Sequence, residues 1–285
     1  MKLEKTYSLD TMYKIAKHFI VIGAGGNGGY FIPQLARMVS VQNKIREVQR
    51  LPLHRITIIE ADGVEAKNLT RQNFISSDID KNKGEVMAAR YARAFGLEIG
   101  LVAQYLDSPD MLAKIMRESK SKETPVICGM VDNNKTRKLM HDAFKSYDGA
   151  FYLDAGNEEF AGQCVLGYNH RKDRFVLPRE GGDSIQSFSL PSVCEMFPEV
   201  MEAKDKLPTE MSCAERSESA PQNIYTNMTA ANEALGFINH LLTSNATGTT
   251  PTGLRVHATI FDSRTMNKTT RFNRTSELEK YAAGK

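Results

Sequence analysis

The spacing of apolar residues predicts a strand, a glycine turn and a helix near the N-terminus. Residues 18–22 form a β-branched apolar run that stops at the glycine-rich segment 23–29. Apolar residues then recur at roughly helical spacing over residues 30–49, with an interruption expected near Ser40. Residues 55–60 predict a second buried strand, so these elements form a βαβ unit with parallel neighbouring strands.

The alternation of strands and helices continues to residue 154. Asp80 is placed to cap the first of three further helices, which are predicted over residues 81–95, 109–120 and 135–147. The intervening strands are predicted over residues 97–105, 126–131 and 151–154. This order is typical of an α/β protein with a Rossmann-like, doubly wound, mainly parallel sheet.

The pattern changes in the second half of the chain. A Pro-, Ser- and Glu-rich segment covers residues 180–222 and is too long for a plain connector. The last residues, from 277 onward, are expected to fray. The other predicted elements are a hairpin of residues 161–168 with 174–177, a helix over 223–242 and a closing hairpin of 254–262 with 269–273.

Composition and charge exclude several classes of protein. With 41% hydrophobic and 25% charged residues the chain is too apolar for general disorder. A net charge of +3 gives no field for a nucleic-acid partner. The charged N-terminus and the lack of a long apolar run predict a soluble, cytoplasmic protein without a membrane partner. The 4 cysteines form no Cys-x-x-Cys pair, so we expect neither a disulfide framework nor a zinc site.

The glycine turn is the first candidate for binding chemistry. Its pattern, Gly23-x-Gly25-x-x-Gly28 with Gly26 inside it, lies between a predicted strand and helix. Such a turn lets backbone amides approach a phosphate at the positive end of the helix, although it also serves plain close packing. Glu60 ends the second strand, where an acid would bind a ribose, and Asp62 is its neighbour.

More polar residues follow the strands than a dinucleotide site needs. They are expected at the carboxyl edge of the sheet, where open α/β folds bind ligands. Besides Glu60 and Asp62 they are Asn68, Arg71, Gln72, Lys83 and Asp132.

This set resembles the ThiF/MoeB/ubiquitin-activating superfamily. The shared signature is a glycine turn, an acid, D-x-V-x-x-x-N-L-x-R-Q, a lysine that opens a helix and a D-N strand end, and it covers residues 19–156. The resemblance implies a Mg-ATP-dependent adenylyltransferase that activates the C-terminal glycine of a ubiquitin-like or sulfur-carrier protein. It also implies a homodimer and, less directly, the PRTRC-type branch of ThiF-related proteins.

The resemblance also implies roles for single residues. Glu60 would bind the ribose, Arg71 and Lys83 the phosphates, and Asp132 the Mg²⁺ ion. Asn68 would bind a phosphate or join the metal shell, and Gln72 belongs to the nucleotide-binding set. Relatives of this kind receive an arginine from the partner subunit. No arginine precedes Arg37 here, which leaves Lys5, Lys14 and Lys17 as substitutes.

The long segment resembles the loop that carries the nucleophilic cysteine of ubiquitin-activating enzymes. Cys213 would attack the acyl adenylate and form a thioester; the alternative is an ordinary loop thiol. The sequence leaves the acyl acceptor open between the cysteine of a conjugating enzyme, a sulfur donor and a peptide amide. Cys194 is the lesser candidate, and Cys128 and Cys164 are expected in the core. The parts of the chain would be an adenylation domain, a crossover loop with the cysteine, and a helix and hairpin that complete the same domain, at residues 1–178, 179–222 and 223–285.

Two other functions stay open at this point. An NAD-dependent oxidoreductase would explain the glycine turn and Glu60, but would give Asn68, Arg71, Lys83 and Asp132 no role. A non-catalytic adaptor that binds a nucleotide or a ubiquitin-like protein would be expected to lack ATP-site residues, and these are present.

Overall fold

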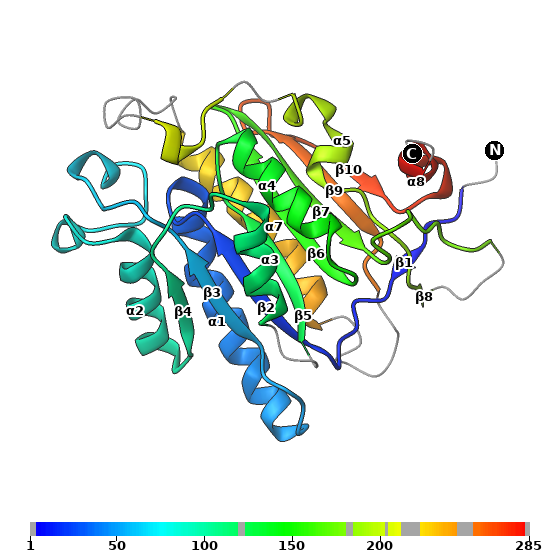
Figure 1. Ribbon diagram of the computed structural model, residues 1–285, viewed down its shortest axis with the longest axis horizontal. Coiled ribbons are helices and arrows are strands. Elements are labelled where there is room, and N and C mark those ends of the chain that lie inside the picture. Colours follow the sequence, from blue (N-terminus) through cyan, green and yellow to red (C-terminus); the bar gives the residue numbers. More distant parts are fainter. Residues whose placement is uncertain are drawn as a thin grey trace.

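The computed structural model describes residues 4–118, 123–180, 185–202, 205–211, 223–243 and 253–282. Cys213, the predicted nucleophile, lies outside these residues. Within them the chain forms an eight-stranded sheet in the order β10-β9-β7-β6-β5-β2-β3-β4 (Figure 1). The short strands β1 (Ser8–Leu9) and β8 (Ile185–Gln186) pair separately.

Five strands of the sheet are parallel. They are β2 (Ala16–Ile22), β3 (Arg55–Ile59), β4 (Ile99–Val102), β5 (Glu123–Gly129) and β6 (Ala150–Asn157). Three antiparallel strands extend the sheet beyond β6, namely β7 (Ala161–Asn169), β9 (Val256–Asp262) and β10 (Asn267–Phe272). This is the predicted Rossmann-like, mainly parallel sheet with a closing hairpin.

Helices cover both faces of the sheet (Figure 1). On one face lie α1 (Gly26–Val48), α2 (Lys83–Phe95) and α7 (Ile224–Thr243), and on the other α3 (Pro109–Arg117), α4 (Asn134–Lys145) and the short α5 (Val193–Met196). Each face has its own hydrophobic cluster, because the central strands are buried on both sides. The last helix, α8 (Thr275–Ala282), follows β10.

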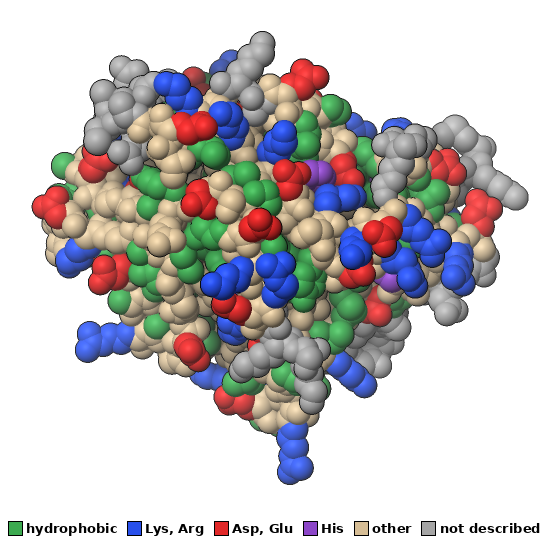
Figure 2. Space-filling model, in the orientation of Figure 1, with side chains coloured by type: hydrophobic (Ala, Val, Ile, Leu, Met, Phe, Trp, Pro, Cys, Tyr) green, Lys and Arg blue, Asp and Glu red, His purple; other side chains and the backbone are tan. Residues whose placement is uncertain are grey.

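The space-filling view adds the charge distribution of one face. Figure 2 shows acidic and basic side chains interspersed over the face that α3, α4 and α5 cover. None of the helices in the described parts of the chain combines the length and the apolar character needed to cross a bilayer.

Two expectations about the helices were wrong. Helix α1 continues through Ser40, whose Oγ donates to the carbonyl of Phe95 at 3.1 Å. Asp80 has a left-handed φ of 68° and does not cap α2. Asn82 does so instead, and its side chain accepts a hydrogen bond from an amide of the first turn.

The predicted fraying of the C-terminal residues was also wrong up to residue 282. Helix α8 buries Leu278 completely, and the amide and hydroxyl of Ser276 donate to the carboxylate of Glu4 at 2.9 and 2.6 Å. Contacts with the distant N-terminal segment therefore hold a helix that local sequence does not predict.

The hairpin predicted for residues 161–168 with 174–177 was wrong in its second strand. Strand β7 pairs with β6 on one side and with β9 on the other, so neither of its edges is free. After β7, Val176 and Ser189 instead exchange hydrogen bonds, and Ser189 is buried.

Candidate functional site

A cavity of about 680 Å³ lies at the carboxyl ends of the parallel strands. The glycine turn after β2, the segments after β3, β4 and β5 and the end of β6 all contribute to its wall. Ten of the eleven predicted nucleotide- and metal-binding residues line it: Gly23, Gly25, Gly26, Glu60, Asp62, Asn68, Arg71, Gln72, Lys83 and Asp132. The predicted residues therefore meet at one site.

Some glycines of the turn allow close packing of the backbone, and others line the cavity. Gly23 has a φ of 94°, and a Cβ there would lie 2.7 Å from the carbonyl oxygen of Met130. Gly28 lies outside the cavity wall, and its Cβ would lie 2.1 Å from the carbonyl oxygen of Gly23. Gly28 thus packs α1 against the turn, while Gly25 and Gly26 line the cavity at the positive end of α1.

Glu60 fastens the glycine turn to the end of β3. Its carboxylate accepts hydrogen bonds from the backbone amides of Ala24, at 2.7 Å, and Asp62, at 2.8 Å. Burial, and then the neighbouring charge of Asp62, raises the pKa of Glu60, although the two amides and Lys83 oppose the shift. The two amides therefore fix the orientation of the Glu60 carboxylate at the cavity wall.

Lys83 is held inside the cavity by Asp62. Its side chain is almost fully buried, and Nζ lies 3.4 Å from Oδ2 of Asp62. The backbone amide of Lys83 donates to the carbonyl of Asp62 at 2.8 Å, and Tyr105 donates its hydroxyl proton to Oδ1 of Asp62. Sequence analysis missed Tyr105, because nothing in its surroundings marks it as facing Asp62.

The turn between residues 65 and 72 brings three predicted residues to the cavity. Asn68 uses Oδ1 to accept from the amide of Glu65 at 2.9 Å, and its carbonyl accepts from the amide of Gln72 at 2.8 Å. Gln72 is buried beside Gly25, and its Oε1 has no hydrogen-bond partner among the described residues. Arg71 lines the same wall.

Asp132 follows β5 and is exposed at the cavity, next to a segment from the distant part of the chain. Oδ2 of Asp205 accepts from the amide of Asn134 at 2.5 Å, and Asn133 Nδ2 donates to the carbonyl of Lys206 at 2.5 Å. Residues 205–211, which continue through Pro208 and Met211, therefore form part of the cavity wall beside Asp132.

The donors around Asp132 suit a magnesium ion that is shared with phosphates. Among the residues that the structure describes, no three His, Cys, Asp or Glu side chains are grouped to hold a metal by themselves. Asp132 and Asp205 are oxygen donors on one cavity wall, and Oδ1 of Asp205 is buried without a partner in the described chain. Mg²⁺ is commonly bound by one or two carboxylates, with substrate phosphates and water as the other ligands.

The described cysteines are unsuited to nucleophilic attack. Cys128, Cys164 and Cys194 are buried, which confirms the first two as core residues. Burial, and then the charge of Asp154, raises the pKa of Cys194 to about 12, so its thiol stays protonated at neutral pH. Lys17 is fully buried and donates to the carbonyl of Met12 within its own chain, so it was a wrong candidate for the partner-supplied cation.

A doubly wound sheet with a glycine turn, a buried lysine and a carboxylate at its carboxyl edge is typical of α/β proteins that bind nucleotides. The chain belongs to the ThiF family, which matches residues 3–278. No curated protein matches the chain.

Several solved structures share the fold. E. coli MccB with succinimide is 15% identical, with 92% of this chain and 65% of that chain covered and a TM-score of 0.56. E. coli MccB with ATP is 14% identical, with 93% and 66% covered and a TM-score of 0.55. PaaA is 14% identical, with 92% and 65% covered and a TM-score of 0.54. The chain thus spans 65% of the length of the first and last of these proteins.

Proposed function

We propose that the protein is an ATP-dependent adenylyltransferase that activates the carboxylate at the end of a polypeptide. The observation that carries this proposal is the convergence of Arg71, Lys83 and Asp132 with the glycine turn in one cavity. Membership of the ThiF family and the fold shared with an ATP complex of MccB support it. An oxidoreductase would have no use for these three side chains beside a dinucleotide.

The reaction is a displacement at the α-phosphorus of ATP. A carboxylate oxygen of the substrate forms a bond to that phosphorus, and the bond to the bridging oxygen of pyrophosphate breaks. The products are an acyl adenylate and pyrophosphate. Negative charge grows on the leaving group and on the equatorial oxygens, so cations fixed in the cavity stabilise the transition state.

The cavity residues divide this work by position. Glu60 binds the ribose. The backbone amides of Gly25 and Gly26, at the start of α1, donate hydrogen bonds to phosphate oxygens. Lys83 and Arg71 bind the phosphates, and the buried position of Lys83 strengthens its interaction with them. Asn68 has committed Oδ1 to the Glu65 amide, which favours phosphate contact through Nδ2 over metal ligation.

Gln72 and Asp132 complete the assignment. Gln72 orients the nucleotide beside Gly25. Asp132, assisted by Asp205, holds Mg²⁺, which when bound neutralises charge on the phosphates.

The polypeptide substrate is a ubiquitin-like or sulfur-carrier protein with a C-terminal glycine, and the enzyme acts as a cytoplasmic homodimer. MccB has been solved with MccA and, in another structure, with ATP, so a protein of this fold binds both kinds of molecule. In the second step, the thiolate of Cys213 attacks the acyl adenylate, forms a thioester and expels AMP. In this reaction the adenylation domain is residues 1–178. The crossover loop is residues 179–222, and the closing helix and hairpin are residues 223–285.

Exchange of label between pyrophosphate and ATP tests the first step. It should require Mg²⁺ and a small protein that ends in glycine, because only a reversible adenylylation returns labelled pyrophosphate to ATP. An oxidoreductase or a non-catalytic adaptor would show no exchange under the same conditions.

Cys213→Ala tests the second step. We expect wild type to form a conjugate on a non-reducing gel that disappears with reductant, and Cys213→Ala to lose the conjugate while keeping exchange. Cys194→Ala is the matched control, because this buried thiol should be dispensable. An unchanged conjugate in Cys213→Ala would remove Cys213 from the mechanism.

A further inference from the structure

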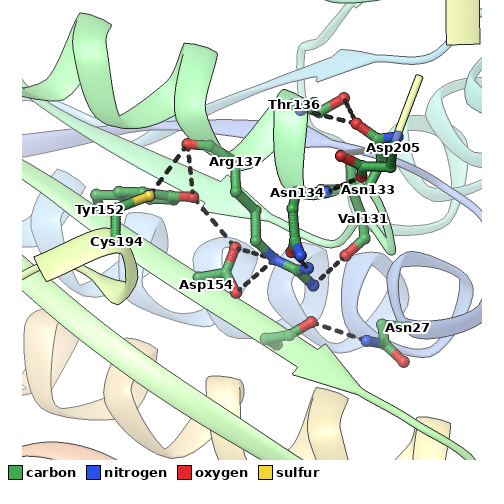
Figure 3. Close-up of polar contacts among 11 residues, drawn as sticks. Asn27, Val131, Asn133, Asn134, Thr136, Arg137, Tyr152, Asp154, Cys194 and Asp205 are labelled. Carbon is green, nitrogen blue, oxygen red and sulfur yellow. Dashed lines mark hydrogen bonds and ion pairs between the residues drawn. The ribbon is translucent and has the colours of Figure 1, made fainter. Parts of the chain in front are cut away.

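A buried ion pair lies directly behind the turn that carries Asp132. Arg137 on α4 and Asp154 on β6 are almost fully buried, and Nε of Arg137 lies 3.2 and 3.3 Å from the two carboxylate oxygens (Figure 3). Tyr152 also donates to Oδ2 of Asp154, at 3.2 Å. Neither Arg137 nor Asp154 has a role in the proposed reaction.

Space for this pair depends on two glycines. A Cβ on Gly129 would lie 2.8 Å from Oδ2 of Asp154, and a Cβ on Gly156 would lie 2.7 Å from Nη2 of Arg137. Burying two charges costs desolvation free energy, and an apolar pair of similar volume is often equally stable. The stability of the fold therefore gives little reason for an ion pair at this position.

The remaining nitrogens of Arg137 hold both sides of Asp132. Nη2 donates to the carbonyl of Val131 at 2.6 Å, and Nη1 donates to Oδ1 of Asn134 at 2.6 Å. In Figure 3 the guanidinium lies between β6 and this turn, with Asp154 on one side and Val131 and Asn134 on the other. The rigid fork of an arginine can make these bonds together, which the single ammonium of a lysine cannot.

The same turn is bonded to the segment of residues 205–211. The amide of Asn134 donates to Asp205, and the side chain of Asn133 donates to the carbonyl of Lys206. Arg137 therefore fixes one end of a connected group that contains the proposed metal ligand and the neighbouring cavity wall.

We propose that Arg137, held by Asp154, is a positioning residue that fixes the carboxylate of Asp132 for the magnesium ion of Mg-ATP. This inference rests on the proposed function, because it takes Asp132 as the metal ligand. Arg137 is not among the described residues that line the cavity, so it acts through the carbonyl of Val131 and the side chain of Asn134. Groups that orient a metal ligand in this way are typically worth 10–100-fold in metal affinity.

Equilibrium binding of ATP as a function of Mg²⁺ tests the inference without relying on activity. In Arg137→Lys the charge beside Asp154 is kept and the bonds to Val131 and Asn134 are lost. We expect the Mg²⁺ concentration for half-maximal tightening of ATP binding to rise about tenfold, with ATP affinity in EDTA unchanged. Lys138→Met, on the exposed side of α4, is the matched control and should bind like wild type.

The double variant Arg137→Met/Asp154→Asn is the second test, because it leaves no unpaired buried charge and keeps an acceptor for Tyr152. This variant should show the same rise in the Mg²⁺ concentration for half-maximal tightening of ATP binding. Wild-type Mg²⁺ dependence in either folded variant overturns the inference, and so does failure of both variants to fold, since the pair would then be structural. Asp132→Asn tests the metal assignment separately from the positioning role of Arg137. If Asp132→Asn keeps wild-type Mg²⁺ dependence, Asp132 is not the metal ligand and the metal assignment of the proposed function fails.

Discussion

At the residue scale, the cavity depends on positions where a side chain cannot be accommodated. Gly28 shows this most clearly, because an added Cβ would lie 2.1 Å from the carbonyl oxygen of Gly23. Gly28→Ala should destabilise the protein by about 1–3 kcal/mol, as over-packing of a closely packed site does. The free energy of unfolding in urea measures this change.

Gly236 on α7 provides the matched control at the residue scale. An added Cβ there meets no atom within 4 Å, so Gly236→Ala should stabilise the helix by about 0.5–1 kcal/mol. If Gly28→Ala proved as stable as wild type, the close packing of α1 against the glycine turn would be wrong.

At the element scale, helix α8 is held by tertiary packing rather than by its own sequence. Leu278 belongs to the hydrophobic cluster that also contains α1 and α7 residues, and it is fully buried. Leu278→Ala should therefore cost about 2–5 kcal/mol in the free energy of unfolding. Glu279→Ala, at an exposed position of the same helix, should change it by less than about 0.5 kcal/mol. Equal, small effects would mean that α8 is frayed.

The elements that sequence predicts are those whose signal is local. The first strand, glycine turn and long helix follow from a change of apolar period at Gly23, and the structure confirms them. The partner of β7 and the formation of α8 depend instead on contacts between distant segments, which period alone cannot specify. The pairing of β7 with β9 joins residues such as Cys164 and Thr259.

At the scale of the whole molecule, the parallel sheet explains why the candidate site could be predicted. Residues that end parallel strands share one edge, so Glu60 and Asp132 had to lie near the glycine turn. The contacts of Tyr105, Asp205 and Arg137 could not be predicted, since they depend on side-chain directions and on a segment returning from far along the chain. Arg137 and Asp154 are 17 residues apart and on different elements.

In the proposed reaction, the cations of this cavity stabilise charge on ATP during adenylylation. Mg²⁺-dependent pyrophosphate–ATP exchange in wild type, Lys83→Met and Lys81→Met, with a glycine-terminated carrier protein as substrate, measures this stabilisation. Lys81 is exposed and donates to the carbonyl of Ser77, so its loss should leave exchange unchanged. Lys83→Met should reduce exchange at least about 100-fold. Equal exchange in all three proteins would contradict the account.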